Sequence, residues 1–320
     1  MRVIGLNQYG GPDVLEAFEL PTPHATAGQV RVKVHAAGIN PVDEMLRSGD
    51  LASWYAGAPY PYIPGMDIAG TLDEISADVD PALGLRVGQR VTGIVDNFGN
   101  YGGYSEYVCL PARSVTAAPP QASFAEAASF LMNALTARNA LDNLTLAAGA
   151  RILVTGAAGA VGAYTVALAK AAGFEPVAIA TAADEPLLHK LGAAMVIARG
   201  DHLAQRVREH FPQGVDAVVD AACIQPQILA AVCDQGQIIV LRPASNETLE
   251  RGITTRFVNV RERATDQPAI RQLADQVSAG LLPMRVEAVF PASEAAAAHR
   301  RLDQGRLRGR LILDFEHSGL

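Results

Sequence analysis

The 320-residue sequence lacks the features that mark several classes of protein. Its three cysteines, Cys109, Cys223 and Cys233, contain no C-x-x-C pair, which argues against a disulfide framework and a structural zinc site. Only 18% of the residues are charged and the net charge is -7, so no basic stripe is available to neutralise nucleic-acid phosphates. Lysine occurs only at positions 33, 170 and 190, which leaves few candidates for Schiff-base chemistry.

Long apolar runs are also missing, although 49% of the residues are hydrophobic. Gly, Arg or Asp interrupts every run before it reaches the roughly 20 apolar residues that a membrane helix needs. No apolar block of signal-peptide length follows Met1, and no acylation motif stands at either end. The sequence therefore predicts a cytoplasmic protein without a membrane or nucleic-acid partner.

The chain is about twice the length of a typical domain, which predicts two domains. In its first third, short apolar-polar alternations between Gly, Pro and Asp turns predict a compact β-rich domain. The expected strands cover residues 29–35, 67–75, 90–95 and 104–110. Ser123 and Glu126 have the spacing of a capping box and predict one long helix that runs to about Leu146.

From Arg151 onward, apolar strand-like runs alternate with helical ones, which predicts an α/β domain with a doubly wound parallel sheet. The six expected strands cover residues 152–155, 177–180, 195–198, 215–220, 237–241 and 257–260. A helix near residues 267–279, an Ala-rich helix ending at Arg300 or Arg301 and a final strand at 310–315 follow. From the pattern alone, this last piece fits either domain.

A glycine-rich turn lies between the first strand of this sheet and the following helix. Glycine allows a sharp turn and a close approach to a pyrophosphate, whose charge meets free N–H groups at the positive end of the helix. A second strand about 25 residues after the first completes the context of a dinucleotide site, which we favour over glycines that serve only packing. The residues expected to bind the dinucleotide are Gly156, Ala157, Gly159, Ala160, Val161 and Gly162.

The end of the second strand favours NADPH, with NADH possible. NAD-selective sheets carry an Asp or Glu there, which binds the ribose hydroxyls and repels a 2′-phosphate. In this chain the position is the neutral Thr181, although Asp184 and Glu185 follow closely. Arg242, just after the fifth strand, is either a source of positive charge for the phosphate or a solvated side chain.

Six motifs in order resemble those of a zinc-independent quinone oxidoreductase of the medium-chain dehydrogenase/reductase superfamily. They are Ala36-Ala-Gly-Ile-Asn40-Pro41-Val-Asp43, Pro64-Gly65-Met66-Asp67-Ile-Ala-Gly70, Val87-Gly88-Gln-Arg90-Val91, Gly102-Gly103-Tyr104-Ser-Glu106-Tyr107, Leu135-Thr136-Ala137 and the glycine triad. The resemblance covers nearly the whole chain. It implies a GroES-like catalytic domain, residues 1–121 and 280–320, with a Rossmann domain, residues 122–279, inserted between its parts.

The resemblance also implies that the protein uses no metal. Zinc-dependent relatives have a cysteine where this chain has Asn40, and Gly-His-Glu where it has Gly65-Met66-Asp67. The cysteines of a structural zinc site are missing from about residues 96 to 107. A catalytic zinc needs three protein ligands and an open position, which these residues do not supply.

Four residues of the first domain are candidate catalytic groups: Asn40, Asp43, Tyr60 and Tyr62. Asn40 and Asp43 suit the N-cap and N3 positions of a helix. The resemblance adds that this turn lines the substrate site, where the Asn40 amide would donate to a carbonyl oxygen. Tyr60 and Tyr62 are open to three interpretations: donating a proton, stacking on a flat quinone or packing alone.

Two more candidates, Asn133 and Thr136, share one face of the helix that Ser123 opens. The resemblance implies that this face contacts the nicotinamide. In the alternative interpretation, the Thr136 hydroxyl only donates a hydrogen bond to the backbone of its own helix. Asp67 is interpreted as a residue that holds a backbone turn. Cys223 stands where relatives usually have glycine, and no neighbouring base in the sequence makes it a nucleophile.

These features together predict an NADPH-dependent oxidoreductase that transfers hydride to a quinone or an α,β-unsaturated carbonyl compound without zinc. One alternative is an enoyl-thioester reductase, with Arg256, Arg261 and Arg263 as its basic rim. The other is a non-catalytic NADPH-binding sensor or scaffold. A homodimer is expected through residues 256–260, which have the pattern of an exposed edge strand.

Overall fold

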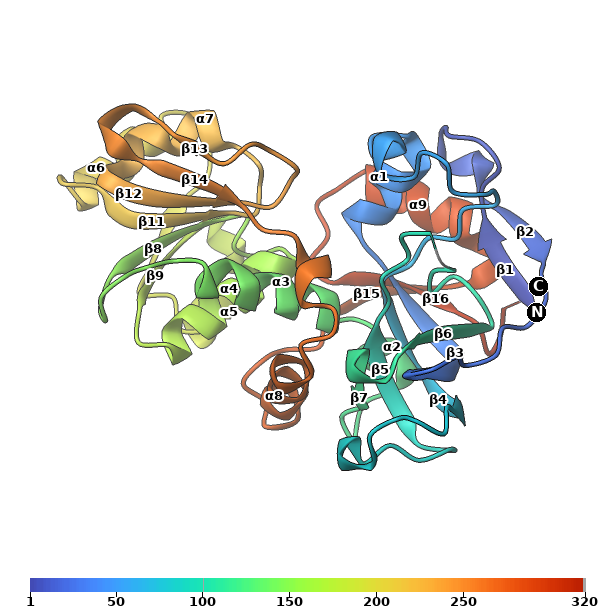
Figure 1. Cartoon of the computed structure of the whole chain (residues 1–320). Coiled ribbons are helices and arrows are strands. Elements are labelled where there is room, and N and C mark those ends of the chain that lie inside the picture. The colour runs from blue at the N-terminus through green and yellow to red at the C-terminus, as the bar shows by residue number, and fades with distance from the viewer. Residues whose placement is uncertain (100, 319–320) are drawn as a thin grey trace. The chain divides into compact units, whose positions relative to one another are not determined.

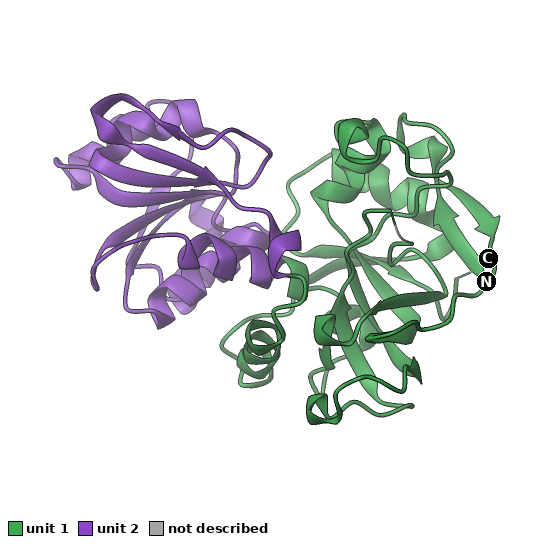
Figure 2. Cartoon of the chain, viewed as in Figure 1, with its two compact units in different colours: residues 1–132, 264–320 green, residues 133–263 purple. Residues whose placement is uncertain are grey.

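The computed structural model describes residues 1–99 and 101–318, in a chain that divides into two compact units (Figures 1 and 2). The first unit is Met1–Met132 with Ala264–Leu320, and the second is Asn133–Arg263. These limits differ from the expected domain boundaries, 121/122 and 279/280. One reason is that helix α8 (Gln267–Ser278) packs on strand β7 (Val115–Ala117) of the first unit.

A largely antiparallel sheet forms the centre of the first unit, in the strand order β15-β16-β3-β4-β5-β7, with β6 also paired to β3. Its other strands are β3 (Gln29–Ile39), β4 (Asp67–Ile75), β5 (Arg90–Ile94), β6 (Tyr107–Pro111), β15 (Val286–Pro291) and β16 (Arg310–Asp314). A hairpin of β1 (Arg2–Gly5) and β2 (Glu16–Glu19) lies beside it, and the helices are α1 (Pro41–Ser48), α2 (Phe124–Ala127), α8 and α9 (Ala295–Asp303). The C-terminal strands therefore complete this unit, as the resemblance implied.

The alternation in β3 produces the buried face that the sequence predicts. Val30, Val32 and Val34 lie in the core, while Arg31 and Lys33 point away from it. Full burial of such a side chain stabilises the fold by roughly 1.5–3 kcal/mol. The strand then continues beyond the predicted end to Ile39, because β16 and β4 cover both of its edges there.

The second unit is the predicted doubly wound sheet, in the order β10-β9-β8-β11-β12-β14-β13. Its strands are β8 (Arg151–Thr155), β9 (Glu175–Ala180), β10 (Met195–Ala198), β11 (Val215–Asp220), β12 (Val232–Val240), β13 (Glu247–Thr248) and β14 (Thr254–Phe257), and only β13 is antiparallel to its neighbour. Its helices are α4 (Ala160–Ala171), α5 (Glu185–Lys190), α6 (Leu203–His210), α7 (Gln225–Ile228) and most of α3 (Leu131–Asp142). The strand order reverses between β8 and β11, where sheets of this kind bind their ligands.

The single long helix predicted after Ser123 is instead two helices, α2 and α3. The capping box is present, since the Ser123 Oγ accepts from the Glu126 N–H at 3.2 Å. However, the Ser129 hydroxyl donates to the Glu126 carbonyl (2.7 Å) and the Thr92 hydroxyl donates to the Ala127 carbonyl (2.9 Å). These side chains satisfy carbonyls that a continuous helix would bond to its own N–H groups, so the helix ends at Ala127.

The predicted edge strand at residues 256–260 is also wrong. Strand β14 ends at Phe257 and lies between β12 and β13, while Val260 begins a 3-10 helix, Val260–Arg263. The short antiparallel strand β13 covers the side of β14 that was expected to be open.

Across residues 1–99 and 101–318, no helix has the length and apolar character that crossing a bilayer requires.

Candidate active site

The dinucleotide turn joins β8 to α4 in the second unit. Gly159 is the N-cap of α4, so the helix begins at Ala160. Gly156 has a φ of 56°, and its carbonyl accepts from the Gly159 N–H at 2.9 Å. A Cβ added at Gly162 would lie 2.3 Å from the same carbonyl oxygen, so only glycine fits this close approach. The expected residues from Gly156 to Gly162 thus form one turn at the start of a helix.

A hydrogen-bonded pair, a hydroxyl and a carboxylate, lies at the strand ends next to this turn. The Thr155 hydroxyl donates to Asp220 Oδ1 at 2.6 Å and accepts from the Ala222 N–H at 2.9 Å, which joins the ends of β8 and β11. This pair was not expected from the sequence, although both residues end apolar strands. Cys223 follows with a φ of 56°, the left-handed conformation that glycine adopts most easily. Burial raises the pKa of its thiol, which keeps it protonated at neutral pH.

At the end of β9, Thr181 is tied to the acid that follows it. The Thr181 hydroxyl donates to Asp184 Oδ2 at 2.7 Å, and its N–H lies 3.3 Å from the same oxygen. Asp184 is only 7% exposed, so its carboxylate is held beside Thr181.

The strand order argues against the role expected for Arg242 at the 2′-phosphate, which stays a prediction. Arg242 follows β12, which is three strands from β9 in the sheet order. At about 4.8 Å per strand, the two ends are about 14 Å apart. Arg242 instead lies near the Cys223 thiol, whose pKa it lowers against the effect of burial.

A cation that was not expected from the sequence does lie at the end of β9. Strand β10 is the neighbour of β9, and the Arg199 N–H beyond it donates to the Ala180 carbonyl at 2.9 Å. The Arg199 side chain is exposed, and within residues 1–99 and 101–318 it has no ion pair or hydrogen bond. The signal available in the sequence was its place directly after a predicted strand.

Asn133 and Thr136 lie on α3, three residues apart, as expected. Both side chains are buried, at 1% and 8% exposure. They follow Met132, whose N–H in the first turn of α3 donates to Asp67 Oδ1 at 2.7 Å. The interpretation of Asp67 as a residue that holds a backbone turn is therefore confirmed.

Asn40 belongs to a buried polar network in the first unit. Its Nδ2 donates to Asp67 Oδ2 at 3.0 Å, and its Oδ1 accepts from the Arg310 guanidinium at 2.6 Å. The side chain has no exposed surface. The prediction that Asn40 donates to a substrate oxygen conflicts with this arrangement, because the amide is directed at groups of its own domain.

Asp43 begins helix α1 and closes the same network. Its Oδ2 accepts from the Asn40 N–H and its Oδ1 from the Gly65 N–H, both at 2.8 Å. Burial raises the pKa of Asp43 to about 7, against these two bonds and the charge of Arg310. Burial likewise raises the pKa of Asp67 to about 6. Two buried carboxylates, Asp43 and Asp67, thus share one guanidinium, Arg310. Because one positive charge balances only one carboxylate, protonation of the other lowers the free energy of the buried group.

Tyr104 and His299 extend this network. The Tyr104 hydroxyl lies 3.0 Å from His299 Nε2, and both residues are fully buried. Burial, together with the nearby positive charge of Arg47, lowers the pKa of His299 to about 3. The imidazole is therefore neutral at physiological pH.

Tyr60 and Tyr62 belong to an aromatic cluster, which consists of Tyr9, Tyr55, Tyr60, Tyr62 and Phe98. The Tyr60 and Tyr62 ring centroids are 4.2 Å apart, and those of Tyr55 and Tyr62 are 5.3 Å apart. The Tyr62 hydroxyl lies 3.3 Å from the Tyr55 carbonyl, to which it donates, whereas Tyr60 is 47% exposed. A mainly apolar pocket adjoins the cluster, lined by Tyr55, Ala58, Pro59, Pro61, Tyr62, Ile63, Asn97, Gly99 and Tyr101.

The residues at the position of a catalytic zinc do not fit a metal ion. The Asn40 amide is bonded to a guanidinium cation, and Met66 is buried in the core with 1% exposure. In the part of the chain that the structure describes, no three His, Cys, Asp or Glu side chains converge as ligands. A second cation beside Arg310 would also be repelled by it.

We predict that the Asp43→Asn variant flattens the pH dependence of stability. Because the folded pKa of Asp43 is raised from 3.8 to about 7, the wild-type protein loses stability as the pH rises from about 4 to 7. The variant should lose roughly 2–4 kcal/mol less over this range, even if it is less stable overall. Urea unfolding at several pH values measures the difference, and equal slopes for the two proteins would contradict the buried titration.

Comparisons with known proteins agree with this architecture. Residues 26–120 match the alcohol dehydrogenase GroES-like domain family, and residues 191–313 match the zinc-binding dehydrogenase family. The chain is 27% identical over 343 residues to the quinone oxidoreductase of Homo sapiens, across 98% of this chain and 97% of the relative. It is 27% identical over 323 residues to the chloroplastic NADPH-dependent alkenal/one oxidoreductase of Arabidopsis thaliana, across 98% of this chain and 79% of that protein.

Among solved structures, the quinone oxidoreductase from Coxiella burnetii superimposes with a TM-score of 0.86 at 27% identity, across 98% of this chain and 99% of that one. Relatives and structure thus share both the fold and nearly the full length of the chain. The chain therefore contains an alcohol dehydrogenase GroES-like domain and a zinc-binding dehydrogenase domain, and over nearly its full length it is similar to quinone oxidoreductases.

Proposed function

We propose that the protein is an NADPH-dependent oxidoreductase that reduces a quinone or an α,β-unsaturated carbonyl compound without zinc. The observation that carries the proposal is the Gly156–Gly162 turn, whose backbone leads into the N-terminus of α4 at the reversal of strand order. Such a turn offers N–H donors and the positive end of a helix to a pyrophosphate. The names of the human and plant relatives support the reaction type.

The aromatic cluster supports a flat, conjugated substrate. The exposed side of this cluster favours planar molecules, because a planar molecule buries apolar area against a ring face. Tyr60 is the member with an exposed side, and the neighbouring Tyr62 phenol and partial burial raise its pKa. Tyr60 therefore stays protonated and is the hydrogen-bond donor that we assign to the substrate oxygen.

The protein's contribution is binding and orientation. Bound NADPH supplies the hydride. The turn holds the pyrophosphate, and the α3 residues Asn133 and Thr136 orient the nicotinamide. Tyr60 donates a hydrogen bond that strengthens as charge develops on the substrate oxygen. A quinone that accepts hydride gains its proton from water, so the reaction needs no strong acid from the protein.

The preference for NADPH follows from a balance of two charges at the end of β9. The Asp184 carboxylate repels a 2′-phosphate, but its Oδ2 is bonded to Thr181. The exposed Arg199 guanidinium attracts the phosphate and matches its geometry with paired donors. Because Arg199 has no competing partner in the described chain, we expect its attraction to outweigh the repulsion.

We predict that Arg199→Ala weakens NADPH binding about tenfold, or roughly 1.4 kcal/mol, and leaves NADH binding unchanged. The reason is that only NADPH carries the phosphate which the guanidinium contacts. Fluorescence titration with both nucleotides measures the effect. Arg242→Ala is the matched control and should change neither affinity, whereas an equal loss of both nucleotides in Arg199→Ala would remove Arg199 from the phosphate site.

The reaction itself is tested with NADPH and a panel of quinones, enones and enoyl thioesters. We expect turnover of quinones or enones that persists in the presence of chelators, with less than stoichiometric zinc in elemental analysis. Turnover confined to enoyl thioesters would favour the thioester reductase, although Arg263 is paired with Asp142 at 3.1 Å and so contributes little to a basic rim. NADPH binding without turnover of any compound would favour the sensor or scaffold.

We also propose that the protein is a homodimer, now through β13. This strand is the outer edge of the second sheet, and Glu247 and Thr248 are exposed. A two-fold axis would pair the open backbone groups of both copies. Light scattering at micromolar concentration should give twice the chain mass, and Thr248→Pro should lower it. A monomeric wild-type protein would refute the dimer. A variant that stays dimeric would show that the interface does not include β13.

A further inference from the structure

A chain of buried hydrogen bonds runs from the C-terminal strand to the first turn of α3. Arg310, at the start of β16, donates to the carbonyl of Ile39 and to Asn40 Oδ1. Asn40 Nδ2 donates to Asp67 Oδ2 at 3.0 Å, and Asp67 Oδ1 accepts from the Met132 N–H at 2.7 Å. All three side chains are buried, with exposures of 0% for Asn40, 1% for Asp67 and 6% for Arg310.

The donors and acceptors of each group fix the direction of the hydrogen bonds in this series. A guanidinium has donors only, so it forces the oxygen of the Asn40 amide toward itself and the nitrogen toward Asp67. A carboxylate has acceptors only, so Asp67 takes one donor on each oxygen, the Asn40 amide and the Met132 N–H. The Asn40 amide therefore cannot flip without placing its nitrogen against the guanidinium and its oxygen against the Asp67 carboxylate.

The backbone is built to bring Asp67 and the α2–α3 link together. A Cβ added at Gly38 would lie 2.5 Å from the Ala128 carbonyl oxygen and 3.0 Å from the Asp67 Cβ. Residue 38 therefore has to be glycine for β3, β4 and this link to approach so closely. In addition, a negative charge in the first turn of a helix is stabilised by the N–H groups and dipole there.

We propose that Asp67 is a positioning residue for the first turn of α3, held in place by Asn40 and Arg310, and that it sets the affinity for the nicotinamide end of the cofactor. The inference rests on the proposed function, in which Asn133 and Thr136 of the same helix contact the nicotinamide. Met132, which Asp67 holds, is the residue directly before Asn133. A shift of this turn therefore moves both nicotinamide contacts and leaves the Gly156 turn in place.

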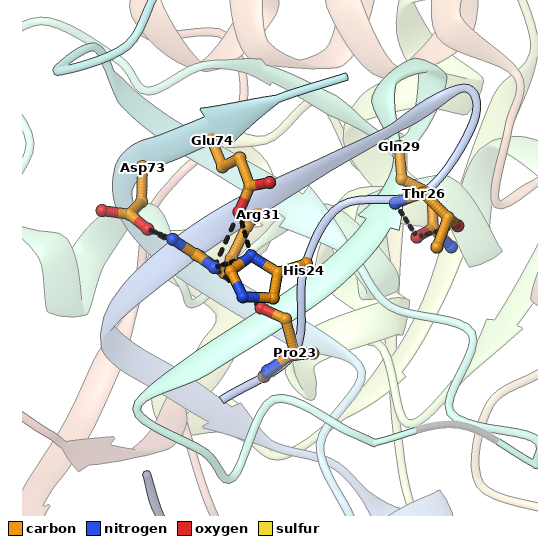
Figure 3. A network of polar contacts seen from close by, with 7 residues as sticks. All are labelled: Pro23, His24, Thr26, Gln29, Arg31, Asp73 and Glu74. Carbon is orange, nitrogen blue, oxygen red and sulfur yellow. Dashed lines mark hydrogen bonds and ion pairs between the residues drawn. The ribbon is translucent and has the colours of Figure 1, made fainter. Parts of the chain in front are cut away.

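A second carboxylate on the same strand provides a matched control. Asp73 of β4 lies at the surface, where its Oδ2 accepts from Arg31 Nε at 2.6 Å, within a network that also includes Glu74 and His24 (Figure 3). Its side chain is 34% exposed and pairs with Arg31 of β3 rather than with α3. Asp73→Asn removes one carboxylate charge from β4, as Asp67→Asn does, without touching the buried chain.

The test compares two ligands by titration calorimetry, so that it does not depend on turnover. NADPH carries the nicotinamide, whereas 2′-phospho-ADP-ribose is the same molecule without it. In Asp67→Asn, the new amide places a donor against the Asn40 amide or against the Met132 N–H. We expect about tenfold weaker binding of NADPH, the effect of losing one hydrogen bond to a charged group, and binding of the fragment within about twofold of wild type. Asp73→Asn should leave both affinities unchanged.

A double variant, Asn40→Asp with Asp67→Asn, exchanges the two groups and restores the three bonds that link Arg310, residue 40, residue 67 and the Met132 N–H. Arg310 then donates to Asp at position 40, Asn at position 67 donates to that carboxylate, and its oxygen accepts from the Met132 N–H. The net charge equals that of the wild type. We expect this variant to bind NADPH within about threefold of the wild-type protein, since no hydrogen bond is lost.

Several results would overturn the proposal. Equal losses for NADPH and the fragment in Asp67→Asn would show a general loss of structure, and unchanged affinities would show that the position of α3 does not depend on Asp67. If Asp67→Asn did not fold, the double variant provides the test. A double variant that binds 2′-phospho-ADP-ribose but not NADPH would refute the role of Asp67. Failure of the wild-type protein to bind either ligand would reject the proposed function, a result distinct from all of these.

Discussion

The arrangement of the first unit depends on one buried cation. Asp43 and Asp67 are both removed from water, and Arg310 is the guanidinium whose charge acts on both. Removing it would leave two carboxylates uncompensated in a low-dielectric interior, which costs far more than losing a surface ion pair. Because Arg310 lies on β16, next to β3 in the sheet, the N-terminal residues cannot form a stable site without the end of the chain. This requirement gives a physical reason for a domain built from two distant segments.

The second unit depends on backbone geometry rather than on buried charge, and its site could be predicted from the sequence to a larger extent. A sharp turn, a close helix approach and free N–H groups are local properties that Gly156, Gly159 and Gly162 encode within seven residues. The regular alternation of strands and helices then determines on which edge the turn lies. The strands β10 and β11 accordingly begin and end where the pattern predicted.

What could not be predicted involves partners distant in the sequence. The direction of the Asn40 amide is set by Arg310, 270 residues away, and the break after Ala127 depends on the Thr92 hydroxyl of β5. The choice between Arg242 and Arg199 needed the strand order, since each follows a strand and only one of these strands is next to β9. Local patterns specify elements, but they do not say which neighbours an element has.

The use of the polar groups inside the first unit has a consequence for selectivity. Asn40, Asp43 and Asp67 are bonded to one another, to Arg310 and to backbone N–H groups, so they offer little to a substrate. In the proposed function, substrate recognition by this unit therefore rests mainly on the aromatic cluster, with the Tyr60 hydroxyl as the hydrogen-bond donor. Hydrophobic pockets discriminate weakly between molecules that differ by one small group, whereas buried polar groups discriminate strongly. From a site of this composition we expect turnover of a class of planar conjugated carbonyl compounds rather than of one member of it.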